Sequence, residues 1–286
     1  MATKKHYSRT TSSKKKPKKS LTSRILFFSI SFLVLVIGAF TVYQFRDGFL
    51  YYLGFKTNKN VNTLSKEERK IADIRIYEVL SKHTDKVFGF DVSQYQGTIN
   101  WSEINKIEDT FQLHFVFVRA TAGKDKVDNT FKENWKQAKK HQFIRGAYHY
   151  YRPNENSIVQ AENFINTVTL EPGDFPPVLD IEQLPKKQSL DSLKVGLKRW
   201  LDKVEKHYKV KPIIYSGESY YKDFLKKEFS EYPFWIANYN FWRNQPDSHW
   251  LLWQFTEKAQ ISGINGTVDV NVFNGDLIYL RSKLVY

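Results

Sequence analysis

The stretch "PPVLDIEQ" at residues 176–183 joins a short apolar run to two carboxylates, Asp180 and Glu182. A run of this length, opened by proline and rich in branched residues, is typical of a buried β-strand. Residues i and i+2 of a strand point to the same side, about 7 Å apart, so both carboxylates face one volume. In a partly apolar volume one of them keeps its proton near neutral pH, as a general acid requires. The competing interpretation is a pair of solvated loop acids, because a lone Asp-x-Glu is common.

Similar runs recur along the chain from residue 87 onward. The first five begin about 30 residues apart, and apolar residues recur at helical spacing within 131–138, 158–165 and 193–204. The last three lie closer together, with Gly, Asn and Pro between them. Strands with crossover helices only in the first part predict an α/β fold, a TIM-like (β/α)5(β)3 barrel. The eight runs are 87–92, 115–120, 145–151, 176–182, 212–217, 233–238, 250–255 and 267–273.

Acidic residues fall where such a barrel places its chemistry. The C-terminal ends of the strands form the active face of a β/α barrel. Asp91 ends the first run and Asp269 lies in the last, so we expect both to join Asp180 and Glu182 as catalytic residues at one mouth. Four acids could instead hold Mg²⁺ or Ca²⁺, although no calcium-binding loop is present. His149, near the end of the third run, fits a structural role better than a ligand role.

Aromatic residues make up 16% of the chain, and several stand at these strand ends. Flat apolar faces of sugars stack on such rings, while polar neighbours bind the hydroxyl groups. The pattern therefore predicts a sugar-binding groove, although most aromatic residues of a barrel belong to its core. The predicted substrate-binding residues are Tyr95, Tyr148, Tyr150, Tyr215, Trp235, Tyr239, Trp253 and Gln254.

The first 45 residues have the pattern of a membrane anchor. Residues 1–24 are rich in Lys and Arg and contain no acid, so most of the net charge of +14 lies there. Residues 25–45 carry no charge and span about 30 Å as a helix, the thickness of a bilayer core. The positive-inside rule places the basic tail in the cytoplasm and the rest outside. A topology signal that also contacts anionic lipid accounts for the lysines of the tail, so binding to nucleic acid is not needed to explain them. A cleaved signal sequence is the alternative.

A stem and a single large domain follow the apolar segment. Residues 46–86 are the predicted stem, in which Ser65 and Glu68 form a capping box for a short amphipathic helix over 66–82. We expect this helix to serve as a spacer. Residues 87–286 are long enough for one barrel domain. The chain has no cysteine, which excludes disulfides, thiolate metal sites and a cysteine nucleophile.

Taken together, these stretches resemble glycoside hydrolase family 25, the N-acetylmuramidase lysozymes. The resemblance runs from about residue 88 to residue 275 and rests on motifs in the family's order. They are "GFDVSQYQGTINW" (89–101), "FVFVRATAG" (115–123), "FKENWKQAKKHQFIRGAYHYYRP" (131–153), "PPVLDIE" (176–182), "PIIYSG" (212–217), "FWIANY" (234–239), "WLLWQF" (250–255) and "GTVDVNVFNG" (266–275).

The resemblance implies hydrolysis of the β-1,4 bond from N-acetylmuramic acid to N-acetylglucosamine in peptidoglycan, without cofactor or metal. Glu182 matches the family's general acid and Asp180 its supporting acid, while Asp91 and Asp269 match two further acids of the pocket. The family usually has an acid where this chain has Ala122 in "ATAG", and tryptophan is commoner at the position of Tyr95. Two other functions remain open: a wall-binding module without activity, and a hydrolase of another N-acetylated polymer such as chitin.

Overall fold

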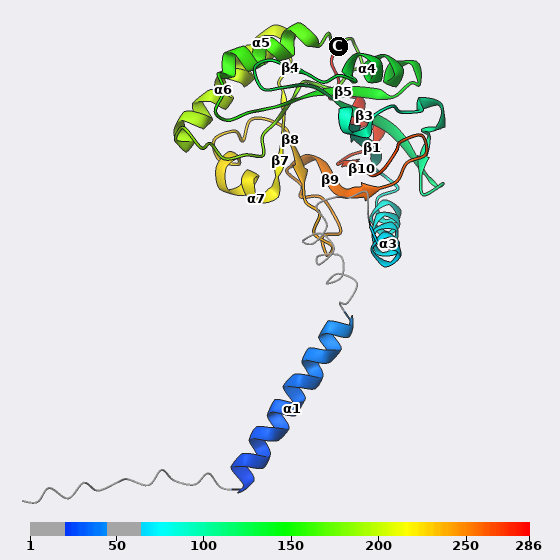
Figure 1. Cartoon of the computed structure of the whole chain (residues 1–286), viewed down its shortest axis with the longest axis vertical. Helices are drawn as coiled ribbons and strands as arrows, with labels where there is room; N and C mark the ends of the chain where they lie inside the picture. The colour runs from blue at the N-terminus through cyan, green and yellow to red at the C-terminus, as the bar shows by residue number, and fades with distance from the viewer. Residues whose placement is uncertain (1–20, 45–63) are drawn as a thin grey trace, which may run out of the picture. The chain divides into compact units, whose positions relative to one another are not determined.

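The computed structural model describes residues 21–44 and 64–286, which belong to two separate compact units (Figure 1). The predicted basic tail at residues 1–24 and the first part of the predicted stem therefore lie almost wholly outside the described residues. The helix α1 (Leu21–Gln44) is described by itself, and the remaining elements belong to the second unit.

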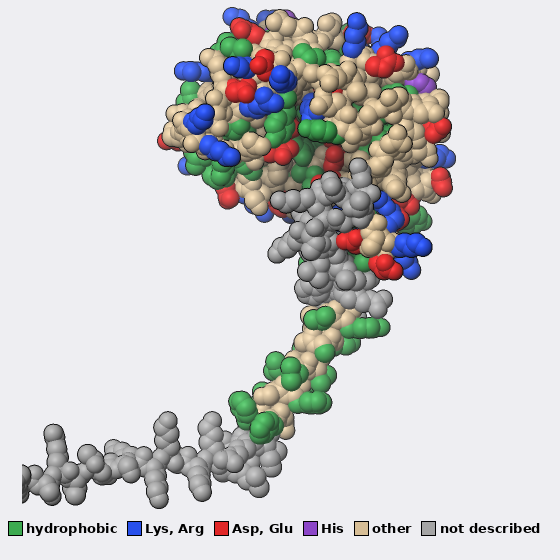
Figure 2. Space-filling model, in the orientation of Figure 1, with side chains coloured by type: hydrophobic (Ala, Val, Ile, Leu, Met, Phe, Trp, Pro, Cys, Tyr) green, Lys and Arg blue, Asp and Glu red, His purple; other side chains and the backbone are tan. Residues whose placement is uncertain are grey.

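Helix α1 contains the one described segment that is long and apolar enough to cross a membrane, Leu26–Tyr43, with a mean hydropathy of 2.3. Its apolar side chains are exposed on all sides, whereas basic and acidic side chains are mixed over the surface of the second unit (Figure 2). A helix that is apolar all round is stable only within an apolar environment. The predicted apolar helix over residues 25–45 thus lies within α1 apart from its last residue.

The second unit is an α/β fold in which eight strands close into a barrel. Of these eight, the first seven are parallel to one another, and β10 pairs antiparallel with both β9 and β1, which closes the ring. All eight predicted strands are present. They are β1 (Val87–Val92), β3 (Phe111–Ala122), β5 (Ile144–Tyr150), β6 (Val178–Asp180), β7 (Ile213–Gly217), β8 (Phe234–Ala237), β9 (Trp250–Ala259) and β10 (Val268–Phe273).

Three α-helices cover the outside of the parallel strands (Figure 1). Helices α4 (Phe131–Lys140), α5 (Ser157–Thr167) and α6 (Leu190–Tyr208) follow β3, β5 and β6. The predicted apolar stripe is fully buried in α6, whereas part of it is only half-buried in α4 and α5. No helix separates β8, β9 and β10, as the short spacing predicts.

Two connections of the parallel part lack a full helix. Between β1 and β3 lie only the turns η2 (Gln94–Gln96) and η3 (Trp101–Glu103) and the short strand β2 (Lys106–Ile107). Between β7 and β8 lie the single helical turn α7 (Glu218–Tyr220) and the π-helix η4 (Tyr221–Leu225), which continues from it. The strand β4 (Lys126–Val127) pairs with β3, and α8 (Leu277–Arg281) follows β10.

The barrel interior is filled by large rings below the open end. Phe115 and Phe117 belong to the inner apolar cluster, whereas Val116, between them, belongs to the outer cluster under the helices, as strand alternation requires. Two glycines, one on each of the strands β1 and β5 that flank β3, make room for these rings. A Cβ atom at Gly89 would lie 2.3 Å from the Phe115 ring, and one at Gly146 would lie 2.3 Å from the Phe117 ring. The inner cluster therefore forms a solid floor rather than a channel.

The helix α3 (Lys66–Lys82) has the bounds predicted for the stem helix. Its capping box is formed: Glu68 N donates to Ser65 Oγ at 3.2 Å, and Ser65 N donates to Glu68 Oε2 at 2.8 Å. The helix packs against β9, and its buried face includes Ile76 and Val79. Since each is fully buried, α3 is a part of the folded unit.

Candidate active site

A cavity of about 310 Å³ opens at one end of the barrel and gathers the four predicted acids. Asp91, Asp180, Glu182 and Asp269 all line it. Asp180 is the last residue of β6, and Glu182 follows in the loop. Asp269 is the second residue of β10. Because β10 runs antiparallel to β1, the start of β10 lies beside the end of β1, and Asp269 pairs in register with Asp91. The strand ends thus bring together acids from distant parts of the chain.

Asp180 and Glu182 form a coupled pair with different exposure. Asp180 is 5% exposed, whereas Glu182 is exposed at the mouth. Burial, followed by the charge of Glu182, holds the pKa of Asp180 well above its usual range. Burial also raises the pKa of Glu182. The interaction between the two carboxyls raises the pKa of Asp180 and lowers that of Glu182, so Asp180 binds its proton more tightly. The pair therefore retains protons above the usual titration range of carboxylic acids, and Glu182 is the member exposed at the mouth.

Asp91 is held by two side-chain amides. Gln254 Nε2 and Asn271 Nδ2 donate to Asp91 Oδ2 at 2.8 and 2.7 Å. Trp235 Nε1, which can only donate, reaches Asn271 Oδ1 at 2.8 Å, so the amide group of Asn271 must point at the acid. Burial raises the pKa of Asp91 to about 7; the two amides lower it, and Glu182 raises it.

Two tyrosines fix the other amide in the same way. Tyr215 donates to Gln254 Oε1 at 2.8 Å, and the Tyr239 hydroxyl donates to the same oxygen. Burial and nearby charges hold the pKa of both phenols well above the usual range, so both remain donors. Gln254 consequently turns its amide group toward Asp91.

Asp269 completes the acidic lining. Burial holds its pKa well above the usual range, and the charges of Asp91, Glu257 and Glu182 raise it further. With five carboxyls around one small volume, Glu257 included, full ionisation is unfavourable, and the cavity retains protons above the usual titration range of carboxylic acids.

The sequence reasoning missed two residues of the site, Glu257 and Asn271. Glu257 lines the cavity because β9 carries extra residues opposite β10: Gln254 and Thr256 pair with consecutive residues of β10. Such a bulge shifts the alternation of inward and outward side chains. Asn271 could have been found from sequence, since it stands two residues after Asp269 on the same strand face.

The structure does not bring Trp253 to the cavity. It is fully buried in the outer cluster, where its Nε1 donates to Asn238 O at 3.0 Å, and its ring lies against His83. Its neighbours Leu252 and Gln254 face inward, so alternation points Trp253 away. The prediction that Trp253 binds substrate is therefore wrong, because its side chain lies in the outer core and not in the cavity. The cavity does include Tyr148, Tyr215, Trp235 and Tyr239.

Tyr95 and Tyr150 line a second cavity of about 570 Å³. Tyr95 is 80% exposed, and the Arg119 guanidinium lies 4.7 Å from its ring centre. Tyr150 stands two residues after Tyr148 of the first cavity, on the same strand. Ala122, where the family resemblance leads one to expect an acid, also faces this space, which three cations line: Arg119, Lys126 and Arg152.

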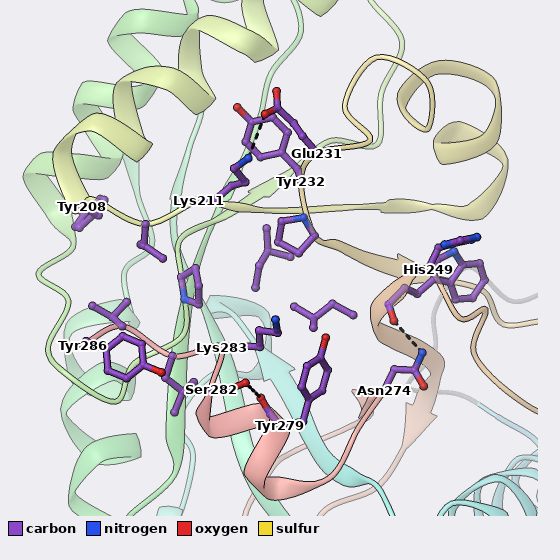
Figure 3. A pocket seen from close by; sticks show the side chains of 18 of the residues that line it. Tyr208, Lys211, Glu231, Tyr232, His249, Asn274, Tyr279, Ser282, Lys283 and Tyr286 are labelled. Atoms are coloured by element: carbon purple, nitrogen blue, oxygen red, sulfur yellow. Dashed lines mark hydrogen bonds and ion pairs between the residues drawn. The ribbon is translucent and has the colours of Figure 1, made fainter.

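A larger cavity of about 630 Å³ lies where β7, β8 and β9 begin, the opposite end of these strands from Asp180 and Glu182 (Figure 3). It is lined by Tyr279 and Lys283 from the C-terminal segment, and its acid Glu231 is paired with Lys211 at 3.1 Å. This space holds no pair of carboxyls and therefore lacks the general acid that the first cavity provides.

His149 has the structural role expected for it. It is fully buried, with Nδ1 2.7 Å from Thr121 Oγ1 and Nε2 3.2 Å from Gln160 Oε1. Burial lowers its pKa to about 3, so the ring is neutral. Its ring stacks on Trp200 in the outer core.

Comparisons with known proteins agree with this geometry. Residues 90–264 match the model of "Glycosyl hydrolases family 25". The chain is 42% identical over 200 residues to the uncharacterized protein YegX of Escherichia coli strain K12, covering 68% of this chain and 72% of that protein. It is 30% identical to Lysozyme M1 of Streptomyces globisporus, covering 67% and 69%. The solved structure of a family 25 glycosyl hydrolase from Bacillus anthracis superimposes with a TM-score of 0.62 at 30% identity, covering 70% of this chain and 94% of that one.

Proposed function

Because this chain belongs to glycosyl hydrolases family 25, we infer that it is a peptidoglycan hydrolase, an N-acetylmuramidase that cleaves the β-1,4 bond between N-acetylmuramic acid and N-acetylglucosamine. The family membership confirms the resemblance found in the sequence motifs. The observation that carries the assignment is the single cavity that Asp91, Asp180, Glu182 and Asp269 line within the matched domain or directly beside it.

In the proposed mechanism Glu182 is the general acid. It lies at the exposed mouth and protonates the glycosidic oxygen as the bond to the anomeric carbon breaks. Buried Asp180 lies beside it, and burial raises the pKa of both carboxyls, so Glu182 keeps its proton at a higher pH than an ordinary glutamate. The positive charge that develops at the anomeric carbon is stabilised by the neighbouring carboxylates.

Attack on the anomeric carbon follows one of two routes. A water molecule attacks directly, or the N-acetyl oxygen of the substrate attacks first and water then opens the intermediate. The first route inverts the configuration at the anomeric carbon, and the second retains it. Proton NMR of the initial product therefore distinguishes the two routes.

Asp91 and Asp269 are proposed to line the subsite for the sugar that is cleaved. The amides of Gln254 and Asn271 fix the orientation of Asp91, which preorganises the site before substrate arrives. Tyr148, Tyr215 and Tyr239 add ring surfaces and hydroxyl groups for the sugar.

The second cavity is proposed to hold the next sugar of the glycan strand. The exposed ring of Tyr95 offers a flat face for stacking, and Tyr150 connects the two cavities along β5. Arg119 and Arg152 are paired with Asp128 and Glu155. Lys126 adds a further cation that suits a glycan whose muramic acid residues carry carboxylates.

The finer architecture is also proposed. We assign the barrel to residues 87–286 and to the (β/α)5(β)3 type. Its first connection has 3-10 turns and the strand β2 in place of an α-helix, and its fifth has the short helical segment α7–η4. The proposed segments before it are a cytoplasmic tail at 1–24, a membrane helix at 25–45 and a stem at 46–86.

We propose that α1 anchors the protein as a single membrane span with the hydrolase domain outside the cell, facing the wall. We predict that the full-length protein fractionates with membranes and resists extraction by salt, because the apolar segment rather than charge holds it. Detergent should release it. Recovery of the hydrolase in the culture medium would instead indicate a cleaved signal sequence.

The chemistry uses a proton and carboxylates only, and we predict that it needs no metal. Incubation with EDTA followed by gel filtration should leave the rate of reducing-end release from purified wall unchanged. Loss of activity that Mg²⁺ or Ca²⁺ restores would support the alternative in which the acids bind a metal.

Release of reducing ends also separates the remaining alternatives. A wall-binding module without activity would bind purified peptidoglycan and release none. A chitinase-like enzyme would release them faster from chitin than from peptidoglycan. We expect release from peptidoglycan and none from chitin.

A further inference from the structure

The helix α3 contacts the barrel at two points that flank residues of the catalytic cavity. The helix ends at Lys82, before the stretch that the family model matches begins at residue 90. At one point it binds the loop that follows Tyr239, and at the other it binds the backbone beside Glu257. Tyr239 and Glu257 both line the cavity.

Arg75 makes the first of these contacts. Although charged, it lies on the buried face of α3 and is 2% exposed. Its Nη1 donates to Asn244 Oδ1 at 3.1 Å, and its Nη2 donates to Asn240 O at 3.4 Å and also to Arg243 O. Its guanidinium lies 5.8 Å from the ring centre of Phe241. One side chain thus binds a short segment of loop at four places.

Two further side chains hold the same wall of the barrel. His83, just after the helix, lies with Nε2 2.9 Å from Asn244 O, and because a carbonyl can only accept, the ring nitrogen donates. Arg69 Nη1 donates to Lys258 O at 2.6 Å, directly after Glu257. The bonds of Arg69 and Arg75 are partly buried, and hydrogen bonds from a charged donor are among the stronger ones in proteins.

A chain of contacts connects the loop at 240–244, which Arg75 holds, to Asp91 in the cavity. Asn240, held by Arg75, follows Tyr239 directly, and the Tyr239 hydroxyl donates to Gln254, which donates to Asp91. A loop held at one end by hydrogen bonds restricts the positions that its neighbouring ring can take.

We propose that Arg75 is a positioning residue: through the 240–244 loop it sets the place of Tyr239 in the wall of the cavity, so the stem helix is a working part of the substrate site rather than a spacer. This inference rests on the proposed function, because Tyr239 is there assigned to the sugar-binding wall. Arg69 acts in the same way on the segment of Glu257.

The test compares full-length Arg75→Met with the wild type in detergent, on soluble glycan fragments of peptidoglycan. We expect KM to rise about tenfold while kcat changes less than threefold, because ground-state and transition-state binding are lost together. Lys70→Met, which removes an exposed cation from the same helix, is the matched control and should leave both constants unchanged. Hydrogen exchange of the amides at 240–244 should be faster in Arg75→Met only.

A double-mutant cycle tests whether Arg75 acts through Tyr239. In a Tyr239→Ala background, Arg75→Met should raise KM by less than twofold further, since coupled residues are not additive. A second variant, Asn244→Ala, removes one acceptor of Arg75 from the loop while leaving α3 unchanged. It serves as the test if Arg75→Met does not fold, and it should raise KM threefold or more. A lower melting temperature with unchanged KM in these variants, or full additivity in the cycle, would overturn the proposal. Inactivity of the wild type would overturn the proposed function instead.

Discussion

Replacing Glu182 by glutamine is expected to lower the rate of peptidoglycan hydrolysis by about 10²- to 10⁴-fold, the usual contribution of a general acid. The amide has nearly the shape of the carboxyl but cannot donate a proton to the glycosidic oxygen as the bond breaks. The loss should appear in kcat and kcat/KM alike, because proton transfer is an interaction of the transition state. Reducing-end release from purified wall measures the rate.

The fold of this variant should be intact. Glu182 is exposed at the mouth of the cavity, so the substitution removes no core packing. Circular dichroism and the melting temperature check this. Glu133→Gln, an exposed glutamate on the outer helix α4, is the matched control and should retain full activity. Activity of Glu182→Gln near the wild-type value would reject Glu182 as the acid.

Replacing Asp91 by asparagine is expected to change how stability depends on pH. The folded state raises the pKa of Asp91 to about 7 from an ordinary value of 3.8, so it binds this proton more tightly than the unfolded chain. That stabilisation is fully present below about pH 4 and is lost as pH rises through about 7. It amounts to something on the order of 4 kcal/mol, since each pKa unit corresponds to about 1.4 kcal/mol.

Asparagine cannot ionise, so the variant escapes this loss. Urea unfolding between pH 4 and pH 8 should show the free energy of unfolding falling with pH in the wild type and falling less in Asp91→Asn. The variant should gain several kcal/mol relative to the wild type over this range. The exposed Asp125→Asn variant controls for the change in net charge. Parallel curves for wild type and Asp91→Asn would contradict the raised pKa.

The strands and the position of the acids were accessible from sequence because both depend on local rules. Short branched and aromatic runs predicted all eight strands of the barrel, and the three apolar stripes predicted α4, α5 and α6. The acids were found because a barrel presents its strand ends on one face. Because β10 is antiparallel, its start rather than its end lies at this face, and Asp269 near its start is the register partner of Asp91.

The residues that sequence reasoning misplaced depend on contacts between strands. Trp253 and Gln254 are neighbours within β9, yet only Gln254 faces the cavity. Which of the two points inward depends on the register between β9 and β10, which the sequence of β9 alone does not give. Glu257 faces the cavity because a bulge in β9 shifts the alternation of its side chains, and the local sequence pattern does not predict this bulge.

The role of α3 was hidden for a similar reason. Its cap and bounds follow from Ser65 and Glu68, but Arg75 is not among the residues predicted for the site. A clue was available: Arg75 lies at helical spacing from Ile71 and Val79, on the apolar face. A cation on that face needs buried acceptors, and those acceptors belong to a loop some 165 residues further along the chain.

Mass spectrometry of the muropeptides that the full-length protein releases from purified peptidoglycan tests the central assignment most directly. Cleavage by the Glu182 site predicts soluble fragments whose reducing-end sugar is N-acetylmuramic acid, and their absence from digests with Glu182→Gln. Fragments that end in N-acetylglucosamine, or N-acetylmuramic acid ends released equally by both proteins, would contradict it.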